Sequence, residues 1–365
     1  MRERMSWNVV VPLIALITLA VTWGGANPGP TLAAIEAILL IGAVLAAVHH
    51  AEVVAHRAGE PFGSLVLAAA VTVIELALII ELMASGGNEA ATLARDTAFA
   101  ALMITTNGIA GLSLLLGSHR YGETLFNPRG TGAALATLTT LATLSLVLPT
   151  FTTTRGGQEF SPGQLEFAAV ASLLLYLMFV FTQTVRHRDF FLPVAQKGQQ
   201  RIFDDDESHA EPPSNAAALR SLGLLLAALV AVVGLAEQES PAVEKLVSVA
   251  GFPHSFVGVV IAALVLLPET LAAARAARQG RIQTSLNLTY GSGMASIGLT
   301  IPGIALASIW LKGPLILGLG PTQLVLFALT VVITMLTVIP GRATRLQGEV
   351  HLVLLAAFVF LAIIP

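Results

Sequence analysis

The chain contains no cysteine and few charged residues. Of its 365 residues none is cysteine, only 11% are Asp, Glu, Lys or Arg, and the formal net charge is -3 at pH 7. The absence of cysteine excludes disulfides and thiolate metal sites, so a bound metal ion would need oxygen or imidazole ligands. The small net charge gives no indication of a nucleic acid or another highly charged partner. The scarcity of charge also leaves too little polar surface for a large soluble domain.

Apolar residues dominate the chain instead. They make up 55% of it, and the mean hydropathy is +0.81. Uninterrupted apolar runs of roughly 17 to 25 residues recur along the sequence, which is the length of a transmembrane helix. A membrane β-barrel would show short segments of alternating polarity instead. The predicted fold class is therefore an all-α polytopic membrane protein.

We predict eleven transmembrane spans. They cover approximately residues 9–24, 31–52, 63–85, 97–116, 131–151, 164–183, 216–236, 256–274, 288–311, 322–339 and 350–364. The first span is short and follows two arginines, so a cleaved signal peptide is its alternative interpretation. With a cytoplasmic N-terminus, only Arg95, Arg155, Lys245 and Lys312 of the 19 basic residues fall outside. The positive-inside rule requires such a bias, and it supports the count of eleven.

The spans divide into an N-terminal transmembrane helix and two groups of five. The helix occupies residues 1–28, the first group 29–185 and the second group 216–365. Between the groups, residues 186–215 form a polar segment with an acidic run from Asp204 to Glu207. This composition predicts a solvated cytoplasmic linker, and a cation-sensing role is the alternative.

The two groups repeat each other weakly. Gly59-Glu60-Pro61 precedes Glu75 in the first group, and Gly251-Phe252-Pro253 precedes Glu269 in the second. A patch of small residues follows each glutamate in the next span, at 107–112 and at 292–297. Because each repeat has an odd number of spans, the second copy must be inverted in the membrane, as in many secondary transporters.

Glu75 and Glu269 are the predicted cation- and proton-binding residues. Each lies within an apolar span, where an ionised group costs several kcal/mol, of the order of 3, unless it is neutralised. Superposing the inverted repeats brings both to the middle of the membrane. Two carboxylates facing each other there need a cation between them, or a proton on at least one of them. Cation and proton would then compete for the same oxygens, although each glutamate could instead be a buried acid without a role in transport.

Further ligands are predicted from the small-residue patches. Asn107 and Ser292 would add oxygen ligands, and Gly108 and Gly293 would let the helices unwind and expose carbonyl groups to a hard cation. Close packing of helices through small residues is the alternative. Thr72 lies one turn before Glu75 and is a further candidate, although membrane threonines usually bond back to their own helix.

A stripe of three polar residues lies near the predicted cytoplasmic end of the second span. His49, Glu52 and His56 are spaced three and four apart, which places them on one face of a helix. Imidazole titrates near neutral pH, so the stripe could relay protons to Glu75. An interfacial polar cluster without that role is equally consistent with the spacing.

The chain resembles the Ca2+/H+ antiporters of the cation/Ca2+ exchanger superfamily, and within them the bacterial ChaA-type branch. The resemblance rests on residues 59–65 through Glu75-Leu76, on Pro268-Glu269 and on residues 287–292, and it covers nearly all of the chain. It implies eleven helices with two inverted five-helix repeats, and a metal site at the glutamates of the third and eighth helices. It also implies export of Ca2+, Na+ or K+ in exchange for protons across the inner membrane, without a cofactor.

The sequence departs from the resemblance at one place. Many members of the family have Gly-Asn near each acid, whereas this chain has Val71-Thr72 and Val265-Leu266. The loss of two amide ligands argues against strict selectivity for Ca2+. A passive cation channel or a non-transporting membrane scaffold is the alternative function. The chain lacks an HExxH pair, and an intramembrane enzyme is not expected.

Overall fold

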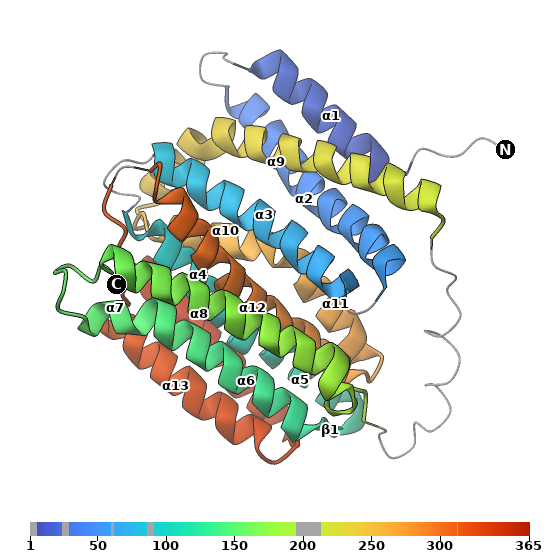
Figure 1. The fold of residues 1–365 in the computed structure, drawn as a ribbon. Coiled ribbons are helices and arrows are strands. Elements are labelled where there is room, and N and C mark those ends of the chain that lie inside the picture. The colour runs from blue at the N-terminus through green and yellow to red at the C-terminus, as the bar shows by residue number, and fades with distance from the viewer. Residues whose placement is uncertain (1–5, 24–28, 60–61, 86–90, 195–212, 312) are drawn as a thin grey trace.

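The protein is a bundle of helices (Figure 1), which confirms the predicted all-α membrane fold class. The computed structural model describes residues 6–23, 29–59, 62–85, 91–194, 213–311 and 313–365. The helices of the first half are α1 (Trp7–Thr22), α2 (Pro30–Ala58), α3 (Phe62–Ser85), α4 (Leu93–Met103), α5 (Ala110–Tyr121), α6 (Pro128–Ala142), α7 (Leu148–Phe151) and α8 (Pro162–Phe181). Those of the second half are α9 (Asn215–Val249), α10 (Phe256–Val265), α11 (Leu267–Arg278), α12 (Ile282–Ala307), α13 (Pro321–Val338) and α14 (Arg345–Ile363). The acidic run at 204–207 lies outside the described residues.

Helices cover all eleven predicted spans. In the described part of the chain, eight helices are long and apolar enough to cross a membrane, or nine if one bent pair counts as a single span. The helix α1 is shorter, with 16 residues. Eleven crossings therefore remain a prediction. The helices α2 and α9 extend beyond their predicted spans, to Ala58 and Val249.

Several of the helices are interrupted. The predicted span 256–274 is two helices, α10 and α11, which meet at Leu266 with a bend of 54°. Pro268 explains the break, because proline lacks a backbone N–H and its ring clashes with the carbonyl of the preceding turn. Short π-helical segments, η2 (Ile104–Ile109) and η3 (Thr143–Val147), separate α4 from α5 and α6 from α7. Each break changes the direction in which the side chains after it project from the helix.

The repeated glycines end corresponding helices. Gly59 follows α2 and Gly251 lies just beyond α9, with φ angles of 68° and 73°. Glycine adopts this left-handed conformation without the steric penalty that a Cβ atom would impose. The two glycines therefore lie at corresponding places in the two halves, between α2 and α3 and between α9 and α10.

Short backbone pairings join the two halves at opposite ends of the bundle. The strand β1 (Glu123–Leu125), between α5 and α6, pairs antiparallel with β2 (Arg342–Thr344), between α13 and α14. A single bridge joins Glu159, before α8, to Ile316, before α13. Exchanging the two halves converts one pairing into the other. Inverted five-helix repeats would produce this arrangement, and we propose the division at 29–185 and 216–365 on that basis.

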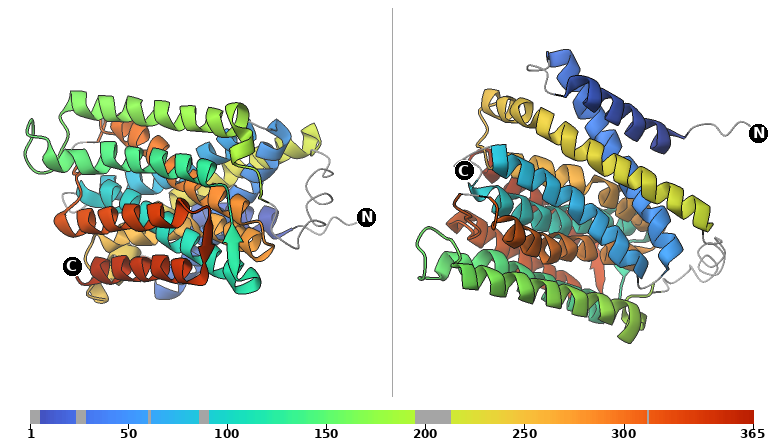
Figure 2. Two further views of the ribbon diagram at one scale, coloured as in Figure 1. Left: turned by 90° about the horizontal axis from the view of Figure 1, so that it is seen from below. Right: turned by 45° about the horizontal axis from the view of Figure 1, so that its top comes forward.

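The helix α12 lies in the middle of the bundle and contacts α3, α4, α6 and α8. The long helices α2 and α9 lie side by side, and α1 packs against both at one edge (Figures 1 and 2). One buried apolar cluster surrounds α12 and a second fills the space between α1, α2, α3 and α9. The cavity described below lies where these two parts of the bundle meet.

The inverted arrangement makes a testable prediction about the two loop pairings. A cysteine at Glu123, in β1, and one at Thr153, in the loop before α8, should lie on opposite sides of the membrane. The protein has no native cysteine, so each variant carries a single thiol. A membrane-impermeant thiol reagent added to intact cells should label one of the two cysteine variants. The other variant should be labelled only after the membrane is permeabilised. Labelling of both from the same side would contradict the inversion.

Candidate functional site

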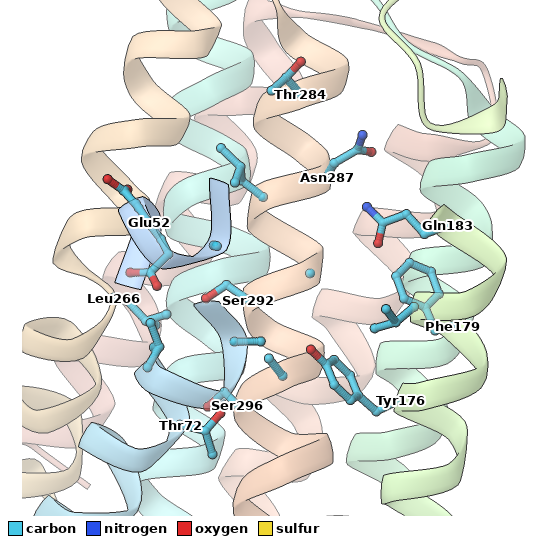
Figure 3. Close-up of a pocket in the computed structure, with 18 of the residues that line it drawn as sticks. Glu52, Thr72, Tyr176, Phe179, Gln183, Leu266, Thr284, Asn287, Ser292 and Ser296 are labelled. Carbon is cyan, nitrogen blue, oxygen red and sulfur yellow. The ribbon is translucent and has the colours of Figure 1, made fainter. Parts of the chain in front are cut away.

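A cavity of about 820 Å³ lies between α2, α3, α8, α11 and α12 (Figure 3). Most of its lining is apolar, and three carboxyl groups interrupt that lining: Glu52, Glu75 and Glu269. It also reaches the exposed residues His56 and Arg57 at the C-terminal end of α2. The cavity therefore connects buried acidic groups with one end of the bundle.

Glu75 is the most deeply buried of the three acids. Its side chain is 3% exposed, and the hydroxyl of Ser296 on α12 donates a hydrogen bond of 2.7 Å to its Oε1. The apolar sequence around it forms a regular helix, in which Ile74 and Leu78 pack into the second apolar cluster. Thr72, one turn earlier, is buried and lines the same cavity. The face of α3 toward α12 thus presents a carboxyl and a hydroxyl group.

Glu269 lies in the first turn of α11, directly after the bend. A carboxylate in this position interacts favourably with the unpaired backbone N–H groups at a helix start. Its Oε2 atom is buried and has no hydrogen-bond partner among the described residues. Glu269 lines the same cavity as Glu75. The structure therefore brings the two predicted acids together from α3 and α11.

One face of α12 supplies hydroxyl groups to the cavity. Ser292 and Ser296 are one turn apart and both line it (Figure 3). Thr300, a further turn along, is fully buried near Glu75, and its hydroxyl has no hydrogen-bond partner in the described structure. Only Ser292 is predicted from the sequence. The spacing of four residues from Ser292 is the signal that could have identified the other two.

The predicted relay residues separate in the structure. Glu52 and His56 line the cavity, and both are exposed. His49 does not line it, and its ring lies beside Trp7 of α1 and His50, with centroid distances of 6.4 and 5.5 Å. The stripe of three is therefore reduced to Glu52 and His56 where the cavity is concerned.

Asn107, Gly108 and Gly293 also lie outside the cavity lining. A Cβ atom on Gly108 would approach Leu355 to 3.1 Å, and one on Gly293 would approach Thr105 to 2.8 Å. Both glycines therefore permit close packing between helices, which is the alternative interpretation of these patches. A role of these residues in ion binding stays a prediction.

Asn107 belongs to a buried hydrogen-bond network that sequence reasoning missed. It lies in the π-helical segment η2 and donates from Nδ2 to Thr330 Oγ1 of α13 at 3.0 Å. Its Oδ1 pairs with Nδ1 of His351 on α14 at 3.0 Å, so the ring donates there. His351 Nε2 lies 3.2 Å from Thr337 Oγ1. Asn107 and His351 are both fully buried, so the network joins three elements inside the bundle.

The cavity offers oxygen atoms of the kind that hard cations bind. Carboxylate and hydroxyl oxygens are suitable ligands for Na+, K+ or Ca2+. In the described part of the chain, no three His, Asp or Glu side chains already converge on one point. Glu75 and Glu269 could therefore hold a cation jointly with hydroxyl groups and water, or each could hold a proton.

The Asn107 network predicts a loss of stability on substitution. Replacing Asn107 with leucine leaves His351 and Thr330 without their partner, at about 1–3 kcal/mol for each unsatisfied buried group. The midpoint of thermal unfolding in detergent should fall. Thr140→Ala, which removes an exposed hydroxyl bonded to its own helix, should leave it unchanged. Unchanged stability together with weaker cation binding would instead place Asn107 on the ion path.

Comparisons of the sequence and of the fold with known proteins all find cation exchangers and ion transporters. A family model described as "Sodium/calcium exchanger protein" matches residues 30–185 and 220–364. The y4hA protein of Sinorhizobium fredii is 44% identical over 98% of this chain and 96% of its own length. The sodium-potassium/proton antiporter ChaA of Escherichia coli is 34% identical over 96% of this chain and 94% of its own. The solved structure of the selenium-substituted Ca2+/H+ antiporter YfkE has a TM-score of 0.71 at 16% identity, covering 98% of each chain.

Proposed function

The chain belongs to the sodium/calcium exchanger protein family, and from this membership and the acidic cavity we propose that it is a secondary active cation/proton antiporter. It would export Ca2+, Na+ or K+ from the cytoplasm and take up protons in return. The observation that carries the proposal is the meeting of Glu75 and Glu269, from the two halves of the chain, in one cavity.

The chemistry of exchange follows from the burial of these two acids. A carboxylate removed from water loses its hydration and must be neutralised. Ser296 donates a hydrogen bond to Glu75, and in the described structure Oε2 of Glu269 has no hydrogen-bond partner. A cation between the two groups neutralises both, and protons can replace it. Because the same oxygens bind either ion, the arrival of one favours the release of the other.

The hydroxyl groups of Ser292, Ser296 and Thr72 would complete the coordination. They are neutral oxygen donors, and no amide side chain is positioned beside either acid at Val71-Thr72 or Val265-Leu266. A site of two carboxylates and hydroxyls suits monovalent cations as well as Ca2+. The 34% identity to a sodium-potassium/proton antiporter supports this broader range.

The orientation of the cavity gives the direction of access. It reaches the end of α2 that carries His56 and Arg57. The distribution of basic residues assigns this end to the cytoplasm, together with the N-terminus. We therefore place the protein in the bacterial inner membrane with the cavity open to the cytoplasm, so that cytoplasmic cations reach Glu75 and Glu269 past Glu52.

Substitution of either central acid tests the mechanism. Glu75→Gln and Glu269→Gln each remove one of the two negative charges that bind the cation and the proton, so either should abolish coupled exchange. The measurement is proton movement in proteoliposomes to which Ca2+, Na+ and K+ are added in turn. Glu349→Gln, an exposed surface acid on α14, is the matched control and should transport normally. Full activity in either variant would refute the shared site, and cation flux without proton movement would indicate a channel.

The position of His56 and Glu52 predicts a second, separable effect. Because both line the entry to the cavity, His56→Gln and Glu52→Gln should shift the dependence of transport on pH while retaining exchange. His49→Gln should leave that dependence unchanged, since His49 lies outside the cavity. The measurement is the initial rate of cation-driven proton movement over a range of pH. If the dependence of the transport rate on pH were unchanged in His56→Gln and Glu52→Gln, these two residues would not relay protons to the cavity.

A further inference from the structure

A second pair of buried acids lies between α2 and α9. Glu36 of α2 is fully buried and Glu239 of α9 is 4% exposed. The two carboxyl groups interact with each other, and they come from two helices that lie side by side (Figure 1). Both oxygens of Glu36 and Oε1 of Glu239 are buried without a hydrogen-bond partner in the described structure. No part of the proposed exchange uses these groups.

This pair is separate from the cavity. Neither residue lines it. Glu36 precedes Glu52 by sixteen residues on the same helix, which corresponds to roughly 24 Å along the axis at about 1.5 Å per residue. The pair therefore lies toward the opposite end of α2 from the cavity mouth.

Buried apolar side chains pack at the interface that holds the pair. Leu19 of α1, Leu40 of α2 and Leu235 of α9 are buried in the apolar cluster at this interface. The helices α1 and α10 carry no charged residue. Toward this end of the packed helices, the described charged residues besides the pair are Glu81 on α3, and Glu237 and the exposed Lys245 on α9. No described lysine or arginine forms an ion pair with Glu36 or Glu239.

We propose that Glu36 and Glu239 form a second proton-binding site, in which one carboxyl group donates a hydrogen bond to the other. Two buried carboxylates without a cation repel each other in a region of low dielectric constant. One proton removes that repulsion and supplies a hydrogen-bond donor to carboxyl oxygens that have none in the described structure. A metal ion such as Ca2+ would need about six oxygen ligands, whereas the pair offers only its own carboxyl oxygens.

The bound proton holds α2 against α9. Loss of the proton leaves two like charges at the interface between these helices and favours their separation. This inference stands apart from the proposed exchange, because the proton can be observed on the pair without measuring transport.

Infrared spectroscopy tests the site directly. The purified protein in lipid nanodiscs is titrated from neutral to alkaline pH, and the carbonyl band of protonated carboxyl groups is recorded. Glu36→Gln/Glu239→Gln should lose a share of this band equal to at least one carboxyl group per protein. Glu349→Gln, whose carboxylate is ion-paired with Arg345 on an exposed surface, is the matched control and should lose none.

Each outcome of this titration decides for or against the pair. A band of full intensity in the double variant shows that the pair carries no proton and overturns the proposal. If the double variant does not fold, the single variants Glu36→Gln and Glu239→Gln serve instead. The remaining carboxyl group then keeps the proton but exchanges a carboxylate partner for an amide, so a band unchanged in both intensity and frequency in both variants overturns the proposal. Displacement of the pair's band by Na+ or K+ at constant pH, in a Glu75→Gln/Glu269→Gln background, would show a cation site and overturn a site for protons alone.

A distance measurement tests the mechanical role. Spin labels at Ile38→Cys of α2 and Val233→Cys of α9 lie on exposed positions of a chain without native cysteine. The mean distance between the two labels should increase, or the distribution of distances should broaden, at alkaline pH. Both should remain constant in the Glu36→Gln/Glu239→Gln background, where the amides stay neutral. A constant distance in both backgrounds would show that the proton does not hold the two helices together.

Discussion

A carboxyl group taken out of water must be neutralised, and this constraint governs the interior of the protein. Glu75 accepts a hydrogen bond from the hydroxyl of Ser296, and Oε2 of Glu269 has no hydrogen-bond partner among the described residues. The rest of the bundle positions these groups. The break at Leu266 places Glu269 at the start of α11, and the hydroxyl face of α12 lies opposite Glu75. An antiporter can use the remaining need for neutralisation, because whichever ion is available on the open side occupies the site.

Other buried polar groups meet the same constraint through hydrogen bonds within the protein. Asn107 and His351 lie as deep as Glu75, yet their hydrogen bonds are made within the protein. A satisfied network of this kind stabilises one arrangement of helices and has no need of an ion. Glu36 and Glu239 resemble the central acids instead, since they are buried and three of their four carboxyl oxygens have no hydrogen-bond partner among the described residues. The lack of hydrogen-bond partners is therefore the feature on which both proposed ion-binding positions rest.

Each half of the chain contributes one central acid to the cavity, but the helices that carry the two acids differ in structure. The pairing of β1 with β2 and the bridge from Glu159 to Ile316 relate the halves at opposite ends. However, α3 is continuous where its counterpart is divided into α10 and α11. Glu75 therefore projects from the middle of a helix, whereas Glu269 lies at a helix start. The two acids reach one cavity by different local structures, and they differ in their hydrogen-bonding partners.

The sequence alone determined the membrane class and the helical character of the apolar runs, and it drew attention to Glu75 and Glu269 within them. Long apolar runs admit only one solution in a bilayer, and a charged residue inside such a run is conspicuous. The tertiary structure decided which polar residues share a cavity. Asn107 and Ser292 occupy comparable patches in the sequence, yet one bonds to His351 and the other faces Glu75's cavity. The pairing of Glu36 with Glu239 depends on contact between helices about two hundred residues apart. A helical sequence specifies which residues share a face, but only packing specifies what that face meets.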